Sequence, residues 1–436
     1  MKEVGGVFSY EIIGGRRITI IADPVLYEII FSPDEMGMTP GVGDAVKIEV
    51  EKLAHAWFGI PKGICAFTRP SLSSVRKAIG PQNVTGLANQ VGAGVQKIFN
   101  GMGDSGIVDL VQIAHGTFWP VNQAMFGDMT IGPDITPGAD DWFHQFDEYI
   151  PQVTGGMPAA MFEEMQEAAT KIVDMFEKSI SAGNHLNHDK CPVLHDRFVA
   201  FDSNQFDSLE KAKFMISLFW APQANTLPMT WWVLVHILSD PRVKKKVEDE
   251  VRNGQFKHAP YNGNEYPAED DDLPYTRACM KEVLRMYIAN LTHRHTSRDI
   301  PVKTSEGVWY RIPKKDMLSV ASYTRHYDDA IYKDPHKFYP ERWFEEKHGV
   351  NDFWPFALGK WSCSGKFLAM LEIPILTALF FRDFDTELVD PVPAADWEKV
   401  VASVRPQGWP YNTNCRVKFT RRLVSKESVA FKASSL

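Results

Sequence analysis

The stretch Pro355-Phe356-Ala357-Leu358-Gly359-Lys360-Trp361-Ser362-Cys363-Ser364-Gly365 decides how the rest of this chain is interpreted. It is followed by the apolar run Lys366-Phe367-Leu368-Ala369-Met370-Leu371-Glu372, which predicts a helix that begins near Gly365. The N–H groups at the start of such a helix carry positive partial charge, so they favour a thiolate at Cys363. Glycines on both sides of the cysteine allow the backbone to pass close to a flat ligand. We call residues 355–365 the cysteine loop and expect Cys363 to be a metal ligand.

The spacing Phe356-x-x-Gly359-x-x-x-Cys363-x-Gly365-x-x-x-Ala369-x-x-Glu372 resembles the cysteine-loop signature of the cytochrome P450 family. The resemblance implies that haem b is the cofactor and that Cys363 binds its iron as a thiolate, which favours cleavage of an O–O bond. Phe356, Gly359 and Gly365 would then shape the loop against the haem. A buried structural cysteine is the alternative for Cys363 alone, and the full spacing argues against it.

The haem propionates of this family need cationic partners, and one usual partner is missing here. Where the family commonly has an arginine, two residues before the cysteine, this chain has Trp361, with Lys360 as a weaker substitute. The resemblance also implies a propionate-binding arginine in a strand, and Arg294 in Leu291-Thr292-His293-Arg294-His295 matches it. The flanking histidines, His293 and His295, are interpreted as solvent-facing or pocket-lining side chains.

The longest apolar segment, Phe214 to Leu238, contains Pro222 and Pro228 and therefore predicts a long helix with a kink. In the resembled family this helix crosses over the haem. The usual acid followed by threonine is replaced by Ala224 and Asn225, with Thr226 one residue later, which implies a weaker proton relay. The expected distal-site residues are Asn225 and Thr226, and the expected lining of the substrate pocket is Phe219, Trp220, Ala221 and Leu291.

Ala224-Asn225-Thr226 resembles the branch of the family that contains sterol 7α- and 12α-hydroxylases and prostacyclin synthase. The resemblance implies a monooxygenase acting on a steroid-, terpenoid- or other secondary-metabolite-like molecule. Because one member of that branch rearranges a peroxide, an isomerase or dehydratase without external electrons is the alternative function. A haem protein that only binds a ligand is a second alternative. Asn225 itself can also be a helix-interior amide that hydrogen-bonds the neighbouring backbone.

Glu282-x-x-Arg285 places a carboxylate and a guanidinium on one helix face. Alone, such a pair is usually a surface ion pair worth a few tenths of a kcal/mol. Phe338-Tyr339-Pro340-Glu341-Arg342-Trp343 resembles the second arginine motif of the family, so we expect Glu282, Arg285 and Arg342 to form a buried charge network that holds the cysteine loop.

Composition sets the broad class. The chain has 436 residues, 44% of them hydrophobic, a net charge of −8 and five widely spaced cysteines. These values indicate a globular protein from a reducing compartment, without a disulfide framework, and argue against nucleic acid as a partner. The resemblance implies a lipophilic small-molecule substrate and an NADPH-dependent reductase, since no flavin or nicotinamide fingerprint is present. Lys281, Lys360 and Lys366 are the expected docking cations for that reductase.

The resemblance covers nearly the whole chain and implies one mainly α (α+β) domain over residues 1–436, with a long helix over the haem and a small β-rich lobe. Residues 7–22 predict two strands around Gly14-Gly15, in a β-rich N-terminal part of about 1–60. The membrane anchor that precedes this hairpin in the family is absent, which we interpret as trimming. With a trimmed anchor, the full-length protein is expected on the cytosolic face of the endoplasmic reticulum membrane, and otherwise in the cytoplasm. We also expect a monomer.

Overall fold

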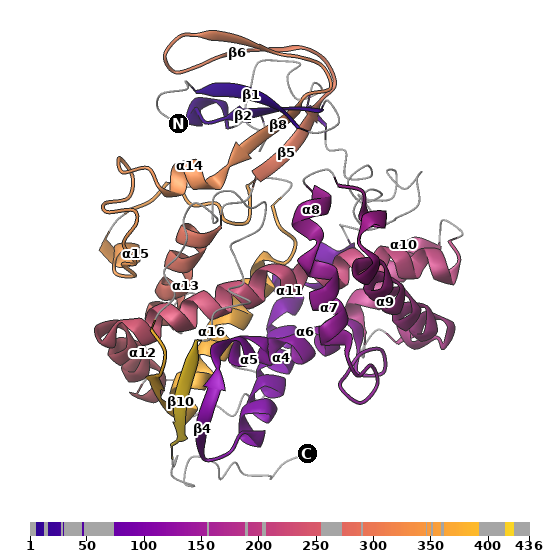
Figure 1. The fold of residues 1–436 in the computed structure, drawn as a ribbon, viewed down its shortest axis with the longest axis vertical. Helices are drawn as coiled ribbons and strands as arrows, with labels where there is room; N and C mark the ends of the chain where they lie inside the picture. The colour runs from indigo at the N-terminus through magenta and orange to yellow at the C-terminus, as the bar shows by residue number, and fades with distance from the viewer. Residues whose placement is uncertain are drawn as a thin grey trace.

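The computed structural model describes residues 6–12, 16–27, 29, 46–47, 74–154, 157–187, 191–202, 206–253, 273–288, 291–345, 347–349, 352–358, 362–391 and 415–422. Helices dominate these residues, and short strands form a lobe at the end of the molecule that holds the N-terminal hairpin (Figure 1). This arrangement confirms the predicted α+β fold class with helix in excess.

The described helices fall largely where the sequence predicts helical periodicity. The α-helices are α4 (Pro81–Gly101), α5 (Leu110–Ala114), α6 (Phe118–Phe126), α7 (Ala139–Glu148), α8 (Ile150–Thr154), α9 (Glu163–Ser181), α10 (Pro192–Asp202), α11 (Ser208–Ser239), α12 (Pro241–Asn253), α13 (Pro274–Tyr287), α14 (Ser322–His326), α15 (Arg342–Glu345) and α16 (Lys366–Asp383). Short 3₁₀ turns are η1 (Pro24–Leu26), η3 (His115–Thr117), η4 (Ala159–Met161) and η5 (Asn184–Leu186). The helix expected from Pro24 is described only as the turn η1.

Three small sheets lie in the described part of the chain. The largest has the order β1-β2-β8-β5-β3, from β1 (Val7–Ile12), β2 (Arg16–Ile21), β3 (Val46–Lys47), β5 (Leu291–Thr296) and β8 (Met317–Ala321). The second has the order β4-β10-β9, from β4 (Ser105–Asp109), β9 (Phe384–Leu388) and β10 (Arg416–Arg421). The third is the pair β6 (Ile300–Lys303) and β7 (Trp309–Ile312). The antiparallel pairing of β1 with β2 confirms the predicted hairpin.

Strand β2 pairs in parallel with β8, although about 300 residues of chain separate the two. Asp316, which precedes β8, accepts from Nε of Arg17 at 2.9 Å and from Oγ1 of Thr19 at 2.7 Å. Because Asp316 is buried, these bonds satisfy a carboxylate that water reaches poorly. The side chains thus fix the N-terminal hairpin against the strand that leads toward the cysteine loop.

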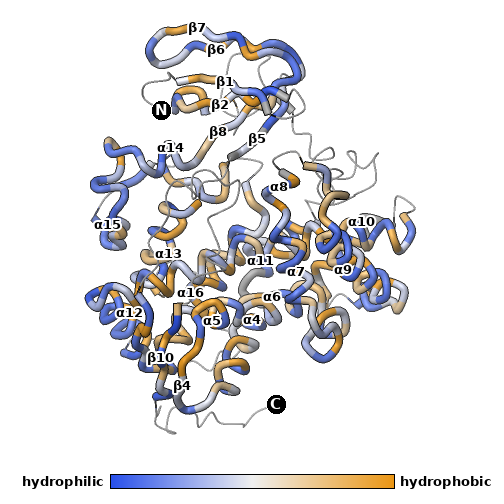
Figure 2. Tube along the Cα trace, in the orientation of Figure 1, coloured by the Kyte–Doolittle hydropathy of each residue, from blue (hydrophilic) through white to orange (hydrophobic). Residues whose placement is uncertain are grey.

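Helix α11 is the central element of the helical region, where it packs against α5, α9, α12, α13 and α16 (Figure 1). Asp207 and Glu210 form a capping box at its start. The helix continues through Pro222 and Pro228 as one element of 32 residues. Along the tube in Figure 2, α11 and α16 are largely hydrophobic, whereas α12 carries many hydrophilic residues. This pattern agrees with helices enclosed on most sides and a helix that borders solvent.

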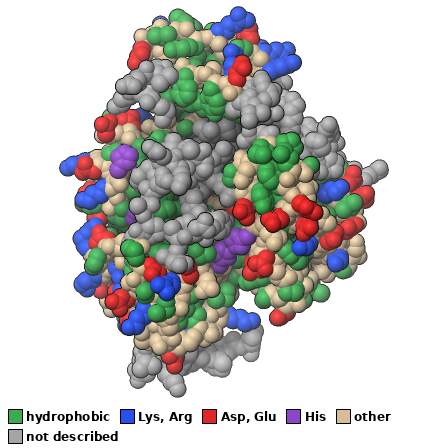
Figure 3. Space-filling view, viewed as in Figure 1, with side chains coloured by type: hydrophobic (Ala, Val, Ile, Leu, Met, Phe, Trp, Pro, Cys, Tyr) green, Lys and Arg blue, Asp and Glu red, His purple; other side chains and the backbone are tan. Residues whose placement is uncertain are grey.

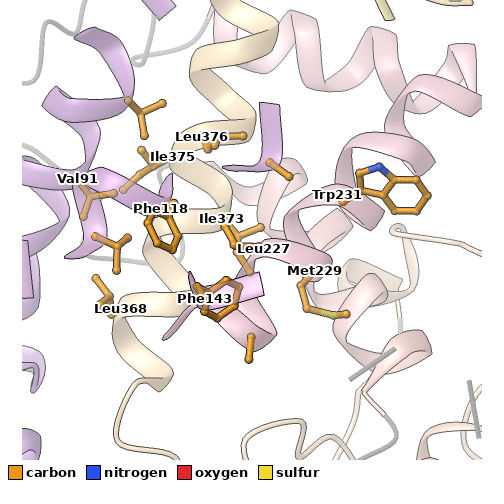
Figure 4. Close-up of a cluster of buried hydrophobic side chains, with 14 of the residues drawn as sticks. Val91, Phe118, Phe143, Leu227, Met229, Trp231, Leu368, Ile373, Ile375 and Leu376 are labelled. Atoms are coloured by element: carbon orange, nitrogen blue, oxygen red, sulfur yellow. The ribbon is translucent and has the colours of Figure 1, made fainter. Parts of the chain in front are cut away.

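The core between α4, α11 and α16 is built from branched aliphatic and aromatic side chains. Figure 4 shows Phe118, Leu227 and Ile373 from different helices converging on one another, and each is buried. Phe118 also meets Phe143 and Phe219 in tilted or edge-to-face geometry, with ring centroids 5.8 and 6.1 Å apart. These contacts fix α11 against α6 and α7 on one side and α16 on another.

Charged side chains of both signs cover the face drawn in Figure 3, and acidic ones gather on the side where α7 to α9 lie. The first turn of α7 carries Asp140 and Asp141, and the first turn of α9 carries Glu163 and Glu164. Carboxylates at these positions complement the positive ends of the helix dipoles. Within the described ranges, no helix combines the length and the apolar character needed to cross a membrane.

The N-terminus of α13 is capped by a side chain from another helix. Glu250 of α12 accepts from the N–H of Tyr275 at 2.7 Å and from the N–H of Thr276 at 2.9 Å. The Thr276 hydroxyl donates to the same carboxylate at 2.5 Å. Burial raises the pKa of Glu250, and these hydrogen bonds act to lower it. Glu250 therefore satisfies helix N–H groups that are otherwise unpaired.

We expect Glu250→Gln to destabilise the protein by about 1–3 kcal/mol, because the new amide NH₂ would face the N–H groups that the carboxylate accepts. The measurement is the free energy of unfolding in urea. Asp249→Asn is the matched control, since Asp249 makes an exposed pair with Lys245 and its loss should cost less than about 1 kcal/mol. Equal effects of the two changes would contradict a capping role.

Candidate active site

The cysteine loop is closed by backbone hydrogen bonds on both sides of Cys363. The N–H of Cys363 donates to the carbonyl of Phe356 at 2.8 Å, and Ala357 takes a left-handed conformation with φ 57°. Helix α16 begins at Lys366 with Gly365 as its N-cap, as the sequence predicts. A Cβ added at Gly365 would lie 3.8 Å from the Cys363 sulfur. Gly359, Lys360 and Trp361 lie outside the described residues, so the roles expected for them stay predictions.

The N–H groups of Gly365 and Lys366 hydrogen-bond to the Cys363 sulfur and act to lower the thiol pKa. Burial nevertheless raises the pKa of Cys363 overall, because desolvation of the thiolate outweighs these donors and the nearby Arg76. The N–H groups at the start of α16 therefore act in the predicted direction, but desolvation of the thiolate is the larger effect. Cys363 is nevertheless an exposed residue among the described ones, so a ligand can reach it.

Arg76 is a cationic partner of the cysteine loop that the sequence analysis missed. Its Nη2 donates to the carbonyl of Ser362 at 2.8 Å, and its Nε donates to Oγ of Ser364 at 3.3 Å. These bonds join two positions separated by almost 290 residues. No local motif marks Arg76, because the contact exists only after the chain has folded.

Arg294 lies on β5 opposite Leu318 of β8 and is buried. Burial lowers the pKa of this guanidinium to about 10. Burying a guanidinium costs desolvation free energy, which a carboxylate ligand would offset. Its expected role with a propionate stays a prediction. The structure does not describe the side chain of Leu291 on the same strand, so its expected place in the pocket stays a prediction.

One face of α11 is left open by the other described elements. The residues with exposed or partly exposed side chains along its middle recur one turn apart, and we call them the open stripe: Ser217, Leu218, Ala221, Pro222 and Asn225. Nδ2 of Asn225 donates to the carbonyl of Ala221 at 3.2 Å, the backbone bond that the alternative interpretation expects. The stripe is mainly apolar. Its amide hydrogen-bond acceptor is the side-chain oxygen Oδ1 of Asn225.

Two of the residues expected to line a pocket point elsewhere. Phe219 is completely buried, and its ring lies 6.2 Å from that of Phe176 in the aromatic core, so the expectation that it lines a pocket was wrong. Trp220 donates from Nε1 to the buried carboxylate of Asp147 at 2.7 Å, which ties α11 to α7. Ala221 is the expected pocket residue that lies on the open stripe.

Thr226 is buried and faces α16 instead of the open stripe. It lies near Glu372, the last residue of the sequence signature, and its hydroxyl acts to lower the pKa of that carboxyl group. Glu372 is 2% exposed, and burial raises its pKa to about 7 although Thr226 acts to lower it. The sequence analysis named both residues without predicting their contact.

Glu282, Arg285 and Arg342 form one buried charge network. Arg285 donates to Glu282 through Nε at 3.0 Å and through Nη2 at 2.9 Å, and Nε of Arg342 donates to Glu282 Oε1 at 2.9 Å. The exposed fractions of the three residues are 0%, 0% and 1%. The remaining donors are used as well, since Arg285 also donates to the carbonyls of His326 and Pro335.

The cytochrome P450 family model matches residues 138–408 of this chain. The chain belongs to the cytochrome P450 family. It is 27% identical over 270 residues to cytochrome P450 7A1 of Oryctolagus cuniculus, covering 57% of this chain and 52% of the relative. It is 22% identical over 392 residues to 24-hydroxycholesterol 7-alpha-hydroxylase of Homo sapiens, covering 86% and 80%. With 5-beta-cholestane-3-alpha,7-alpha-diol 12-alpha-hydroxylase of Sus scrofa the identity is 28% over 301 residues, covering 64% and 58%.

The match to the rabbit P450 spans about half of that relative's length, so the activity of the whole protein is argued below as a proposal. The residues present fit the haem-thiolate group of the P450 family. Cys363 is exposed at the N-terminus of α16, and binding to a metal ion would deprotonate its thiol to the thiolate. Arg294 would hold a carboxylate of the group and so offset the desolvation of its guanidinium.

We expect Glu282→Gln to destabilise the P450 by roughly 3–5 kcal/mol, because it leaves the buried charges of Arg285 and Arg342 uncompensated. Urea unfolding followed by the haem absorbance measures the effect. The exposed pair of Asp249 with Lys245 again serves as the reference, and Asp249→Asn should lower stability by less than about 1 kcal/mol. A Glu282→Gln protein as stable as this reference would show that the network contributes little.

Proposed function

We propose that this chain is a monooxygenase that uses haem b to insert one oxygen atom of O₂ into a lipophilic, steroid-like small molecule. The observation that carries the proposal is the position of Cys363, which is exposed at the N-terminus of α16. When bound, the haem thiolate supplies the reduction of O₂ and the transfer of one oxygen atom. The other oxygen atom leaves as water, which consumes two electrons and two protons.

The substrate class is supported by the relatives and by the open stripe. The names of the relatives include a 24-hydroxycholesterol 7-alpha-hydroxylase and a cholestane-diol 12-alpha-hydroxylase. An apolar helix face with one amide suits a largely hydrocarbon ligand with few polar groups. Ala221 and Leu218 would contact the hydrocarbon, and the Asn225 amide would orient a hydroxyl of the substrate.

Electrons would come from a separate NADPH-dependent reductase, since the sequence carries no flavin or nicotinamide fingerprint. The isomerase alternative is less favoured, because the named relatives are hydroxylases and a 14-alpha demethylase. The ligand-binding alternative predicts that replacing Cys363 changes the haem spectrum but removes no product.

The decisive experiment incubates the purified haem protein with a lipophilic metabolite pool, with and without NADPH and a reductase, and analyses the products by mass spectrometry. We expect a product heavier by one oxygen atom only when electrons are supplied. Cys363→Ser should abolish both this product and the thiolate-type absorption of the ferrous–CO complex. A product of unchanged mass that forms without NADPH would instead support the isomerase.

Asn225→Ala should lower kcat/KM on the order of ten- to a hundredfold, because a substrate hydroxyl would lose its hydrogen-bond partner. The thiolate-type absorption should stay intact. Gln112→Ala, the deletion of an exposed amide on α5, is the matched control and should leave kcat/KM unchanged. Unchanged kinetics in Asn225→Ala would favour the interpretation of Asn225 as a helix-interior amide.

A further inference from the structure

A group of packed aromatic rings lies between α11 and α13. The ring of Trp232 stacks on that of Tyr287, with centroids 4.0 Å apart, and Trp231 meets Trp232 edge-to-face at 4.7 Å. The ring of His236 lies 5.6 Å from that of Tyr287. We call Trp231, Trp232, His236 and Tyr287 the aromatic stack. Indole and phenol lose one electron more readily than other aromatic side chains, so a packed series of them can carry electrons.

The aromatic stack continues the helix face that carries the open stripe. Leu218 and Asn225 belong to the stripe, and Trp232 follows Asn225 after the same step of seven residues that separates these two. Seven residues make nearly two turns of α-helix, so the three side chains share one face, with about 10 Å along the axis between neighbours. Tyr287 of α13 covers this face at Trp232, whereas Asn225 is partly exposed. Oxidation at the stripe therefore has a readily oxidised ring close by on the same helix.

The Tyr287 hydroxyl has a proton acceptor beside it. Nε2 of His236 lies 2.8 Å from the Tyr287 oxygen, and it accepts from the phenol in the tautomer that carries the ring proton on Nδ1. Desolvation lowers the pKa of His236 to about 4, so its ring is neutral and able to accept near neutral pH. A phenol that has lost one electron is a far stronger acid than an imidazolium ion. Oxidation of Tyr287 would therefore transfer its proton to His236 and leave a neutral phenoxyl ring.

Trp231 differs from Tyr287 because its proton has no acceptor. The residue is 0% exposed, and its Nε1 atom has no hydrogen-bond partner within the part of the chain that the structure describes. Figure 4 shows its indole extending from α11. An oxidised Trp231 would keep both its proton and its positive charge, so it would stay a strong oxidant toward the next ring. This difference directs oxidation from α11 to Tyr287 on α13.

From Tyr287 the series of rings continues toward the surface. The Tyr327 hydroxyl donates to the carbonyl of Met286 at 2.6 Å, and Tyr287 acts to raise the pKa of Tyr327, so the two phenols are neighbours. The ring of Tyr323 lies 4.7 Å from that of Tyr327, and both residues are partly exposed. A soluble reductant can reach these two rings, whereas the indole of Trp232 is buried.

We propose that the aromatic stack is an electron-transfer path that reduces a peroxide at the open stripe when no substrate is in reach. In each passage the oxidant gains one electron, Tyr287 loses one, and its phenolic proton moves to His236. A soluble one-electron reductant such as ascorbate then returns an electron through Tyr327, and the proton moves back to Tyr287. Two passages and two protons from solvent reduce hydrogen peroxide to two water molecules. The inference rests on the proposed monooxygenase function, which generates such oxidants, and it adds a peroxidase activity.

The first test mixes the ferric haem protein with hydrogen peroxide, without substrate or reductase, and records electron paramagnetic resonance after rapid freezing. The wild type should show a tyrosyl-type radical, and Tyr287→Phe should lose most of this signal. Tyr149→Phe is the matched control, since it removes a phenol outside the stack that bonds Glu164 at the surface, and it should keep the signal. A wild type without a tyrosyl radical, or equal signals in the two variants, would overturn the proposal.

The role of His236 as proton acceptor is tested separately from its packing. His236→Phe keeps a ring next to Phe338, which stacks on His236 at 4.2 Å, but removes the acceptor and should lose the tyrosyl signal. His236→Gln keeps an acceptor and should restore part of the signal. A wild-type signal in His236→Phe, or complete loss in both variants, would remove His236 from the path.

The sites of oxidation trace the path independently of spectra. After peroxide treatment without substrate, mass spectrometry of peptides should find added oxygen at Trp232 and Tyr287 in preference to Trp309. Trp309 is 66% exposed and Trp232 only 5%, so peroxide that attacks from solvent would modify Trp309 first. Ascorbate should suppress the modification of Trp232. Predominant oxidation of Trp309 would contradict transfer through the stack.

Ascorbate consumption measures the added activity itself. Trp232→Phe and Tyr287→Phe should consume ascorbate with peroxide several-fold more slowly than wild type and lose haem absorbance several-fold faster. Tyr149→Phe should match wild type in both rates.

The failure of this inference differs from the failure of the proposed function. Oxygenated product from the metabolite pool, together with wild-type ascorbate rates in Trp232→Phe and Tyr287→Phe, would refute the path alone. A wild type that forms the radical at Tyr287 but no oxygenated product would remove the monooxygenase function and leave the path standing.

Discussion

The arrangement of the chain between α13 and the cysteine loop depends on the buried carboxylate of Glu282. It accepts from Arg285 on its own helix and from Arg342 about 60 residues later, in a region from which water is excluded. It also accepts from the N–H of Tyr339 and from Nε1 of Trp343. A fully bonded carboxylate is what makes two buried guanidinium groups tolerable, because each charge would otherwise carry a large desolvation cost.

The network extends from there toward Cys363 through backbone contacts. Arg285 holds the carbonyl of His326, and Nε2 of His326 accepts from the N–H of Trp354. Burial lowers the pKa of His326 to about 3, so its ring stays neutral and able to accept. Trp354 stands two residues before Phe356, whose carbonyl receives the N–H of Cys363. A continuous path of hydrogen bonds and short chain segments therefore links α13 to the cysteine loop.

The two faces of α11 differ in polarity and in burial. Its open stripe is apolar apart from Ser217 and the Asn225 amide, whereas its buried side places Thr226 against Glu372 of α16. Because α16 also begins at the cysteine loop, a single helix has Cys363 next to its start and carries the buried carboxyl group of Glu372. The arrangement separates a mainly apolar open face from a polar buried contact, within one pair of helices that pack against each other.

Local sequence determined the elements whose signals are local. The spacing around Cys363, the proline-started helices and the alternating strands of the N-terminal hairpin were predictable, because backbone geometry and hydrophobic period are set within a few residues. The family motifs likewise pointed to Glu282, Arg285 and Arg342. The tertiary structure alone decided which side chains meet across long separations: Arg76 with Ser362, Glu250 with the start of α13, and Thr226 with Glu372. It also decided that Phe219 is core and that burial raises the Cys363 pKa, because desolvation depends on atoms contributed by the whole fold.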